Sequence, residues 1–179
     1  MGMKSSMLTN ILLCFSGSPE NSVIIRPMEE KDLSKAAEVH SKALPRQTYS
    51  LEWISSSYRS SPRCLCYVAE KDQQISGYIL WLQKSGFRAD AVIELEQIAV
   101  DPQLQGQGIG TALIKDSIVD VGKVISVFGS AIKHVIVTTR ADNQAQRLYK
   151  STLGAEIEAT ISNLFSADEV YMVARHVQT

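Results

Sequence analysis

Residues 98 to 111 read Ile-Ala-Val-Asp-Pro-Gln-Leu-Gln-Gly-Gln-Gly-Ile-Gly-Thr, and this stretch decides which fold the chain adopts. An apolar strand ends at Val100, Asp101 and Pro102 form a turn, and three glycines then alternate before a helix begins. Glycine lets the backbone turn sharply and approach a ligand closely. The first N–H groups of a helix have no partner within the helix, so they bind anions. The stretch therefore predicts a cradle for a phosphate or pyrophosphate group.

The size and composition of the chain are those of one ordinary globular domain. It has 179 residues, of which 45% are hydrophobic and 21% charged, and its formal net charge is -1. This length is enough for a full hydrophobic core. The Lys and Arg residues are scattered rather than gathered in a basic stripe, and no apolar run approaches the length of a membrane span. We therefore expect neither a nucleic acid nor a membrane as a partner.

The three cysteines and three histidines do not have the spacing of a metal site. Cys64 and Cys66 would point the same way from one strand, but a Cys-x-Cys pair without a second pair or a nearby His is a poor zinc site. We expect no metal. We interpret the cysteines as reduced, half-buried residues of a cytoplasmic protein, and the histidines, far apart in the sequence, as ordinary core or surface residues.

The first 22 residues differ from the rest of the chain. Residues 7–15 form a short apolar run that weakly resembles a signal peptide, and Met1-Gly2 with Ser6 matches the loose myristoylation pattern. We interpret residues 1–22 as a flexible or loosely docked extension that ends in a Ser-, Gly- and Pro-containing linker. Residues 23–179 are predicted to form a single domain.

The predicted elements alternate in a way that indicates an α/β sandwich around one mixed sheet. Apolar residues at helical spacing predict helices, and alternating or β-branched runs predict strands. We expect a bulge at Gly77. In chain order the elements are strand 23–26, helices 29–43 and 49–59, strands 65–70, 75–83 and 91–100, helix 108–129, strand 134–139, helix 142–152, and strands 156–164 and 169–174.

Two common nucleotide sites fit the glycine stretch poorly. A P-loop needs Lys followed by Ser or Thr after its last glycine, and Ile109-Gly110-Thr111 has no Lys. A Rossmann loop needs Gly-x-Gly-x-x-Gly early in a βαβ unit, with an acidic ribose ligand about 20 residues later. Here the spacing is Gly-x-Gly-x-Gly, three strands precede the unit, and Asp120 lies inside a helix with an apolar stripe.

A third class of protein fits the whole segment. Gln105-Gly-Gln-Gly-Ile-Gly110 matches the Gln/Arg-x-x-Gly-x-Gly/Ala signature of the GNAT (Gcn5-related N-acetyltransferase) superfamily, and residues 98–102 resemble its preceding strand. The order of elements from 23 to 173 is also similar to that family. The resemblance implies a GNAT-type mixed sheet of six to seven strands with helices on both faces, acetyl-coenzyme A as co-substrate, and no metal.

The resemblance also implies which residues bind the coenzyme. Backbone N–H groups from 105 to 111 would hold the pyrophosphate. The pantetheine arm would bond to the strand at 98 and 100, where that strand splays from the next, and the amide of 99 or 100 would stabilise the oxyanion. The family usually has Asn seven residues before its tyrosine; here that position is Asp142, which could instead cap the helix. The predicted coenzyme-binding residues are Ile98, Ala99, Val100, Gln105, Gly106, Gln107, Gly108, Ile109, Gly110, Thr111 and Asn143.

Acetylation of an amine needs a base, an oxyanion donor and an acid for the leaving thiolate. With regular alternation, Glu94 and Glu96 share one face of their strand with Ile98 and Val100, and repulsion between the two carboxylates would raise one pKa. Glu96 aligns with the glutamate that many GNAT enzymes use as base, and Glu94 is the alternative. Tyr149, in Leu148-Tyr149, resembles the tyrosine that protonates the thiolate.

These features predict an N-acetyltransferase that transfers acetyl directly from acetyl-coenzyme A to a primary amine of a small molecule, peptide or protein. Acidic residues near the reaction centre favour a cationic acceptor. A non-catalytic acyl-coenzyme A sensing domain is the alternative, and a nucleotide-binding module is a second. We expect the last strand, 169–174, to be exposed, so that it could pair with the same strand of a second copy in a homodimer. The candidate residues for the acceptor pocket are Trp53, Tyr58, Arg63 and Trp81.

Overall fold

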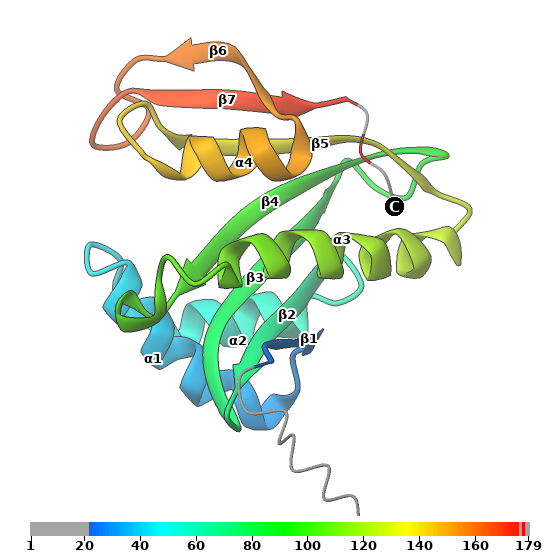
Figure 1. Cartoon of the computed structure of the whole chain (residues 1–179). Helices are drawn as coiled ribbons and strands as arrows, with labels where there is room; N and C mark the ends of the chain where they lie inside the picture. Colours follow the sequence, from blue (N-terminus) through cyan, green and yellow to red (C-terminus); the bar gives the residue numbers. More distant parts are fainter. Residues whose placement is uncertain (1–21, 176, 178–179) are drawn as a thin grey trace, which may run out of the picture.

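A computed structural model of the chain describes residues 22–175 and residue 177, and these form a seven-stranded mixed sheet with helices on both faces (Figure 1). The strand order is β1-β2-β3-β4-β5-β7-β6, and β4 and β5 form the parallel pair. The prediction of a mixed sheet of six to seven strands with helices on both faces is confirmed. Apart from residue 22, the predicted N-terminal extension lies outside the described residues, as does Cys14.

The elements follow the predicted order, with ends that differ by a few residues. The strands are β1 (Ile24–Pro27), β2 (Cys64–Lys71), β3 (Gln74–Lys84), β4 (Asp90–Val100), β5 (Ala131–Arg140), β6 (Glu156–Ile161) and β7 (Glu169–Ala174). The helices are α1 (Leu33–Ala43), α2 (Ser50–Arg59), α3 (Ile109–Ser126) and α4 (Ala145–Leu153), with two 3-10 turns, η1 (Glu30–Asp32) and η2 (Pro102–Leu104). Within the described residues, no helix has the length and hydrophobicity needed to cross a membrane.

The sheet separates two hydrophobic cores (Figure 1). Helices α1 and α2 pack on one face, where Ile54 is fully buried against side chains such as Val68 and Leu80. Helices α3 and α4 pack on the other face, where Leu113 meets side chains that include Trp81. Any residue that faces the first core is thus separated from the second by the thickness of the sheet.

Strand β4 contains a bulge at Glu96. Leu80 of β3 pairs with Gln97, and the next residue, Trp81, pairs with Leu95, so Glu96 is an extra residue opposite neither. A bulge breaks the alternation of side chains along a strand. The alternation of side chains between the two faces of the sheet is therefore shifted by one residue after position 96.

This change of phase corrects one prediction about the strand. Leu95 packs in the core beneath α3, and after the bulge it is Ile98 and Val100 that pack against that same core. Regular alternation would have placed these two with Glu94 and Glu96 on a single face. That prediction is wrong because one extra residue shifts the period of two by one step.

Two other predictions about strands also need correction. The bulge expected at Gly77 lies at its neighbour Ser76, because Ala69 pairs with Gly77 and Glu70 pairs with Ile75. Strand β7 does not form an exposed edge: it lies between β5 and β6, so β6 is the edge strand at this end of the sheet. A dimer that forms by pairing of β7 is therefore excluded, since both sides of that strand are already bonded.

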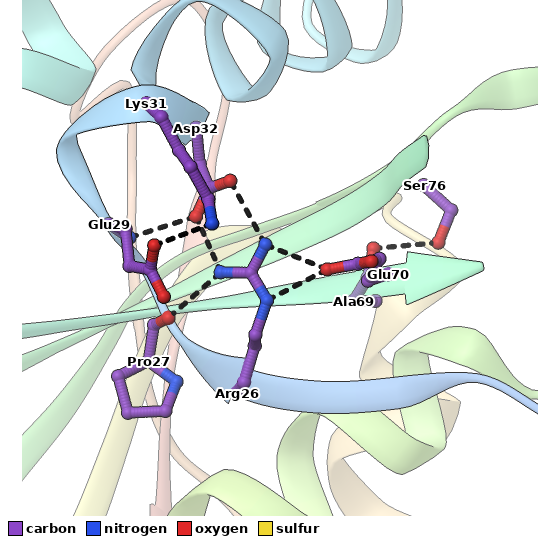
Figure 2. A network of polar contacts seen from close by, with 8 residues as sticks. All are labelled: Arg26, Pro27, Glu29, Lys31, Asp32, Ala69, Glu70 and Ser76. Atoms are coloured by element: carbon purple, nitrogen blue, oxygen red, sulfur yellow. Dashed lines mark hydrogen bonds and ion pairs between the residues drawn. The ribbon is translucent and has the colours of Figure 1, made fainter. Parts of the chain in front are cut away.

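A polar network joins β1 and η1 to β2 (Figure 2). Arg26 of β1 forms ion pairs with Asp32 of η1 at 2.6 Å and with Glu70 of β2 at 2.8 Å. Asp32 also accepts a hydrogen bond of 2.8 Å from the backbone N–H of Glu29. Burial alone would raise the pKa of Asp32, but the hydrogen bonds from Arg26 and Glu29 lower it below its ordinary value.

Candidate active site

The site lies where the parallel strands β4 and β5 separate. Their pairing runs from Asp90 with Ala131 to Glu94 with Ile136, and β5 continues from there in its pairing with β7. Figure 1 shows the two strands diverging, β4 toward α1 and β5 with β7, β6 and α4. A groove of about 650 Å³ opens there, lined by the end of β4, the glycine loop and the first turns of α3 and α4.

The glycine loop turns through two positions that favour glycine. Gly106 and Gly108 have φ angles of 77° and 81°, in the left-handed region that other residues rarely adopt. Gly108 is the N-cap of α3 and has no side chain to cap it, so the N–H groups of the first turn stay available for an anion. A Cβ on Gly110 would lie 3.2 Å from Cδ2 of Leu148, so this glycine lets α3 and α4 approach closely beside the groove.

Most of the predicted coenzyme-binding residues line this groove. They are Ile98, Ala99, Val100, Gln105, Gly106, Gly108, Ile109, Gly110, Thr111 and Asn143. Sequence reasoning missed the other lining residues, Ala43, Leu44, Leu104, Gln144, Ala145 and Leu148, most of which have no chemical signal of their own.

Gln107 lies outside the lining and has a different partner. Its Oε1 accepts a hydrogen bond of 2.9 Å from Nζ of Lys71, at the end of β2. This contact brings an ammonium group to the loop that is predicted to hold phosphates. The sequence could not indicate it, because the two residues lie 36 positions apart.

Asn143 and Asp142 have separate roles at the start of α4. The Asn143 side chain donates to Oγ1 of Thr139 at 2.8 Å and accepts from the backbone N–H of Ala145 at 2.9 Å. Asp142 instead forms an ion pair of 2.8 Å with Arg140. The suggestion that Asp142 caps the helix is therefore wrong, since Asn143 supplies that acceptor. Of the two, Asn143 lines the groove.

Tyr149 is a buried residue in the wall of the groove. It projects from α4, lines the groove, and is 5% exposed. Burial raises the pKa of its phenol to about 12. The hydroxyl is therefore protonated at neutral pH and can donate a proton.

The two glutamates of β4 differ in their partners. Oε2 of Glu94 forms an ion pair of 2.7 Å with Nζ of Lys84. Glu96 is exposed at the bulge, yet partial desolvation raises its pKa, and the charge of Glu94 raises it further, against opposing effects of Lys84 and Arg63. Glu96 lies outside the lining of the groove, two residues before Ile98 on the same strand. Its raised pKa is the direction that a general base requires.

The candidate residues for the acceptor pocket divide between the two faces of the sheet. Trp81 is 1% exposed and donates a hydrogen bond of 2.7 Å to Ser117 of α3. It is buried in the α3 core, so its prediction as a lining residue is wrong. Trp53 is 41% exposed, on α2, and donates a hydrogen bond of 3.0 Å to Gln97 of β4. Tyr58 packs against the core of that same face, and Arg63 is exposed.

The cysteines that the structure describes are buried rather than half-buried. Cys64 and Cys66 are both free, with their Sγ atoms 3.9 Å apart, so they point the same way as predicted. Neither of these two lines the groove. In residues 22–175 and 177, no group of three or more His, Cys, Asp and Glu is placed to hold a metal ion.

The separated parallel strands beside a glycine-rich helix start define an α/β protein whose groove ends at free helix N–H groups, an arrangement suited to an anionic ligand. Residues 28–155 match the model of the acetyltransferase (GNAT) family. The chain therefore belongs to the GNAT acetyltransferase family.

Individual relatives are more distant. An uncharacterized N-acetyltransferase of Methanocaldococcus jannaschii is 34% identical over 93 residues, which are 52% of this chain and 55% of that protein. The chain thus matches about half the length of that curated relative.

Solved structures of low sequence identity share the fold. The ribosomal-protein-S18-alanine N-acetyltransferase of Escherichia coli superposes with a TM-score of 0.70 at 20% identity, covering 88% of this chain and 96% of that one. Arabidopsis thaliana NAA60 in complex with acetyl-CoA gives a TM-score of 0.70 at 16% identity, covering 85% and 97%.

Proposed function

We propose that the protein is an N-acetyltransferase that transfers acetyl directly from acetyl-coenzyme A to a primary amine. The observation that carries the proposal is the groove between the separated strands, because it joins a phosphate cradle to a buried tyrosine within one cavity. Membership of the GNAT family supports the same reaction. We also propose that the protein works in the cytoplasm.

The residues of the groove would each bind one part of the coenzyme. The N–H groups from Gln105 to Thr111 would hold the pyrophosphate, with the ammonium of Lys71 close to the loop. The backbone of Ile98 and Val100 would bond to the pantetheine arm as a short added strand, since these residues lie beyond the point where β4 leaves β5. Asn143 would lie beside the arm on the opposite wall.

The chemical step needs one proton acceptor and one proton donor. Glu96 takes a proton from the bound ammonium, directly or through water, and the neutral nitrogen then adds to the thioester carbonyl to form a tetrahedral oxyanion. The oxyanion collapses as the C–S bond breaks, and the nitrogen releases its second proton to solvent. Tyr149 supplies the proton that the departing sulfur takes up. The backbone N–H of Ala99 or Val100 would hold the oxyanion. Neither Cys64 nor Cys66 lines the groove, which supports direct transfer without an acetyl-cysteine.

The acceptor is proposed only as a class. The carboxylates of Glu94 and Glu96 favour an amine that arrives protonated, because they lower the energy of a nearby cation. The Escherichia coli structure is that of an enzyme named for an alanine of ribosomal protein S18. For this chain we propose a peptide, protein or small-molecule amine, and we leave a homodimer open as its assembly.

The decisive experiment is thiol release from acetyl-coenzyme A over a panel of primary amines, with Glu96→Gln and Tyr149→Phe as separate variants. Each should keep coenzyme affinity and lose roughly 10²-fold in kcat or more, the usual contribution of one acid or base. If transfer, corrected for hydrolysis, is unchanged in both variants, this mechanism is wrong.

The rival function, a non-catalytic acyl-coenzyme A sensor, predicts coenzyme binding without transfer to any amine. A nucleotide-binding module predicts tight binding of ATP or NAD but not of acetyl-coenzyme A. The thiol-release assay distinguishes the sensor from an enzyme, and titration calorimetry with the three ligands identifies the nucleotide-binding module. Either pattern would overturn the proposal.

A further inference from the structure

A chain of side-chain hydrogen bonds runs from β4 to the loop between α1 and α2, on the face away from α3. It centres on Gln97, the residue after the bulge. Oε1 of Gln97 accepts hydrogen bonds from the Tyr78 hydroxyl at 2.6 Å and from the Trp53 indole N–H at 3.0 Å. Its Nε2 donates to Oε1 of Gln47, in the α1–α2 loop, at 2.9 Å. One side chain of β4 is thus bonded to β3, to α2 and to the loop.

The series of hydrogen bonds continues into helices α1 and α2. Oε1 of Gln47 also lies 3.0 Å from Nε2 of His40, on α1. Nδ1 of His40 lies 2.8 Å from Oγ of Ser50, the first residue of α2. His40 is fully buried. We call the six residues His40, Gln47, Ser50, Trp53, Tyr78 and Gln97 the amide relay.

The direction of every hydrogen bond in the amide relay follows from Trp53. An indole N–H can only donate, so Oε1 of Gln97 must face it, and Nε2 of Gln97 must face Gln47. Oε1 of Gln47 then receives that donor, and His40 must donate from Nε2. In neutral His40 the proton is therefore on Nε2, and Nδ1 accepts the hydroxyl of Ser50.

The loop that the amide relay holds belongs to the site. Ala43 and Leu44, where the loop leaves α1, line the groove. At its other end Tyr49 has a φ of 57° and is 77% exposed, a backbone conformation that costs energy for a residue other than glycine. Gln47 bonds to β4 from between these ends, so its contact with Gln97 sets where the loop stands relative to Glu96.

We infer that Gln97 is a positioning residue for the acceptor: through the amide relay it holds the α1–α2 loop and Trp53 against the bulge of β4, as the acceptor-side wall beside Glu96. This inference rests on the proposed function, because the wall matters only if an amine is acetylated there. The Gln97 side chain does not line the coenzyme groove, and the loop meets that groove only where it leaves α1, at Ala43 and Leu44, so loss of the side chain should affect capture of the amine rather than the chemical step.

The test is the variant Gln97→Leu in the full chain. Loss of these hydrogen bonds should raise the KM for the acceptor about tenfold, with kcat and the Kd for acetyl-coenzyme A within about twofold of wild type. Amide hydrogen exchange of the loop should become faster. Gln83→Leu is the matched control, a glutamine of β3 whose Nε2 donates to the Gly86 carbonyl and which should leave all three constants unchanged.

A second variant keeps the inference testable if Gln97→Leu fails to fold. Gln47→Leu alters an exposed loop residue and should raise the acceptor KM in the same direction. If both variants keep wild-type acceptor KM and wild-type exchange of the loop, the inference is overturned.

The tautomer of His40 can be measured without any assay of acetyl transfer. Long-range ¹⁵N–¹H spectra of wild type should show the proton on Nε2, and a proton on Nδ1 alone would overturn the amide relay. A chain that binds acetyl-coenzyme A but acetylates no amine would count against the proposed function. In that case hydrogen exchange and the tautomer would still test whether the amide relay holds the α1–α2 loop, so its failure can be told apart from failure of the proposed function.

Discussion

Nζ of Lys71 lies 2.9 Å from Oε1 of Gln107, so the end of β2 brings a cation to the glycine loop. We expect Lys71→Met to weaken binding of acetyl-coenzyme A about fivefold, the effect of ~1 kcal/mol from one partly exposed charge. Salt screens such charges, so the difference should shrink at high ionic strength. Calorimetry at two salt concentrations measures both effects. Lys133→Met, which breaks the pair with Asp90, is the control and should not alter binding.

The glycine loop can be tested with two chemically identical changes. Gly108 and Gly129 have φ angles of 81° and 70°, and both have open space where a Cβ would lie. Replacing either with Ala should lower the free energy of unfolding by about 1–2 kcal/mol, the cost of a left-handed conformation. Gly108→Ala alone should also weaken coenzyme binding. Equal affinities in the two variants would contradict a role for the Gly108 turn in the cradle.

The pH dependence of transfer should report the base. The pKa of Glu96 is raised, and a base acts only when deprotonated, so kcat/KM should rise with pH through a value above that of an ordinary glutamic acid. Glu96→Gln should remove this limb of the profile. Glu94→Gln should keep it, shifted toward lower pH, because the charge of Glu94 helps to raise the pKa of Glu96. A limb that survives Glu96→Gln would assign the base to another group.

The network of Figure 2 predicts how stability depends on pH. The pKa of Asp32 is lower in the folded than in the unfolded chain. Its stabilisation is therefore complete above the unfolded value of about 4 and is lost as the pH falls through the folded pKa. Arg26→Met should cost about 3 kcal/mol at pH 7 and less at pH 3, measured by urea unfolding. Lys35→Met, in the exposed pair with Glu38, should cost under ~1 kcal/mol.

The order of the elements could be predicted because each carries its own period of apolar residues. Much of the lining of the groove lies in one stretch of sequence, from Ile98 to Thr111, which is why these residues could be grouped from the sequence alone. Their resemblance to a family motif supplied the ligand. These signals are local in the sequence, so they can be interpreted without knowing which strands pair.

Features that depend on pairing could not be predicted. The bulge at Glu96 exists only relative to β3, and without it Glu96 was placed on one face with Ile98 and Val100. The edge position of β6 depends on β7 entering the sheet between β5 and β6. The contact of Gln97 with Gln47 joins residues 50 positions apart. In each case the register or the topology, rather than the residue itself, decides the environment.

Position 96 has two structural properties: it carries a carboxylate, and it is the extra residue of the bulge in β4. After it, Gln97 faces the layer of α1 and α2, while Ile98 and Val100 face the layer of α3 and α4. Deleting the residue would remove the acid and the bulge together, yet Gln97, Ile98 and Val100 would keep their present faces, because Leu95 and Gln97 already lie opposite the adjacent residues Trp81 and Leu80. At this position a substitution changes only a functional group, whereas a deletion also removes the bulge and makes the pairing of β4 with β3 continuous.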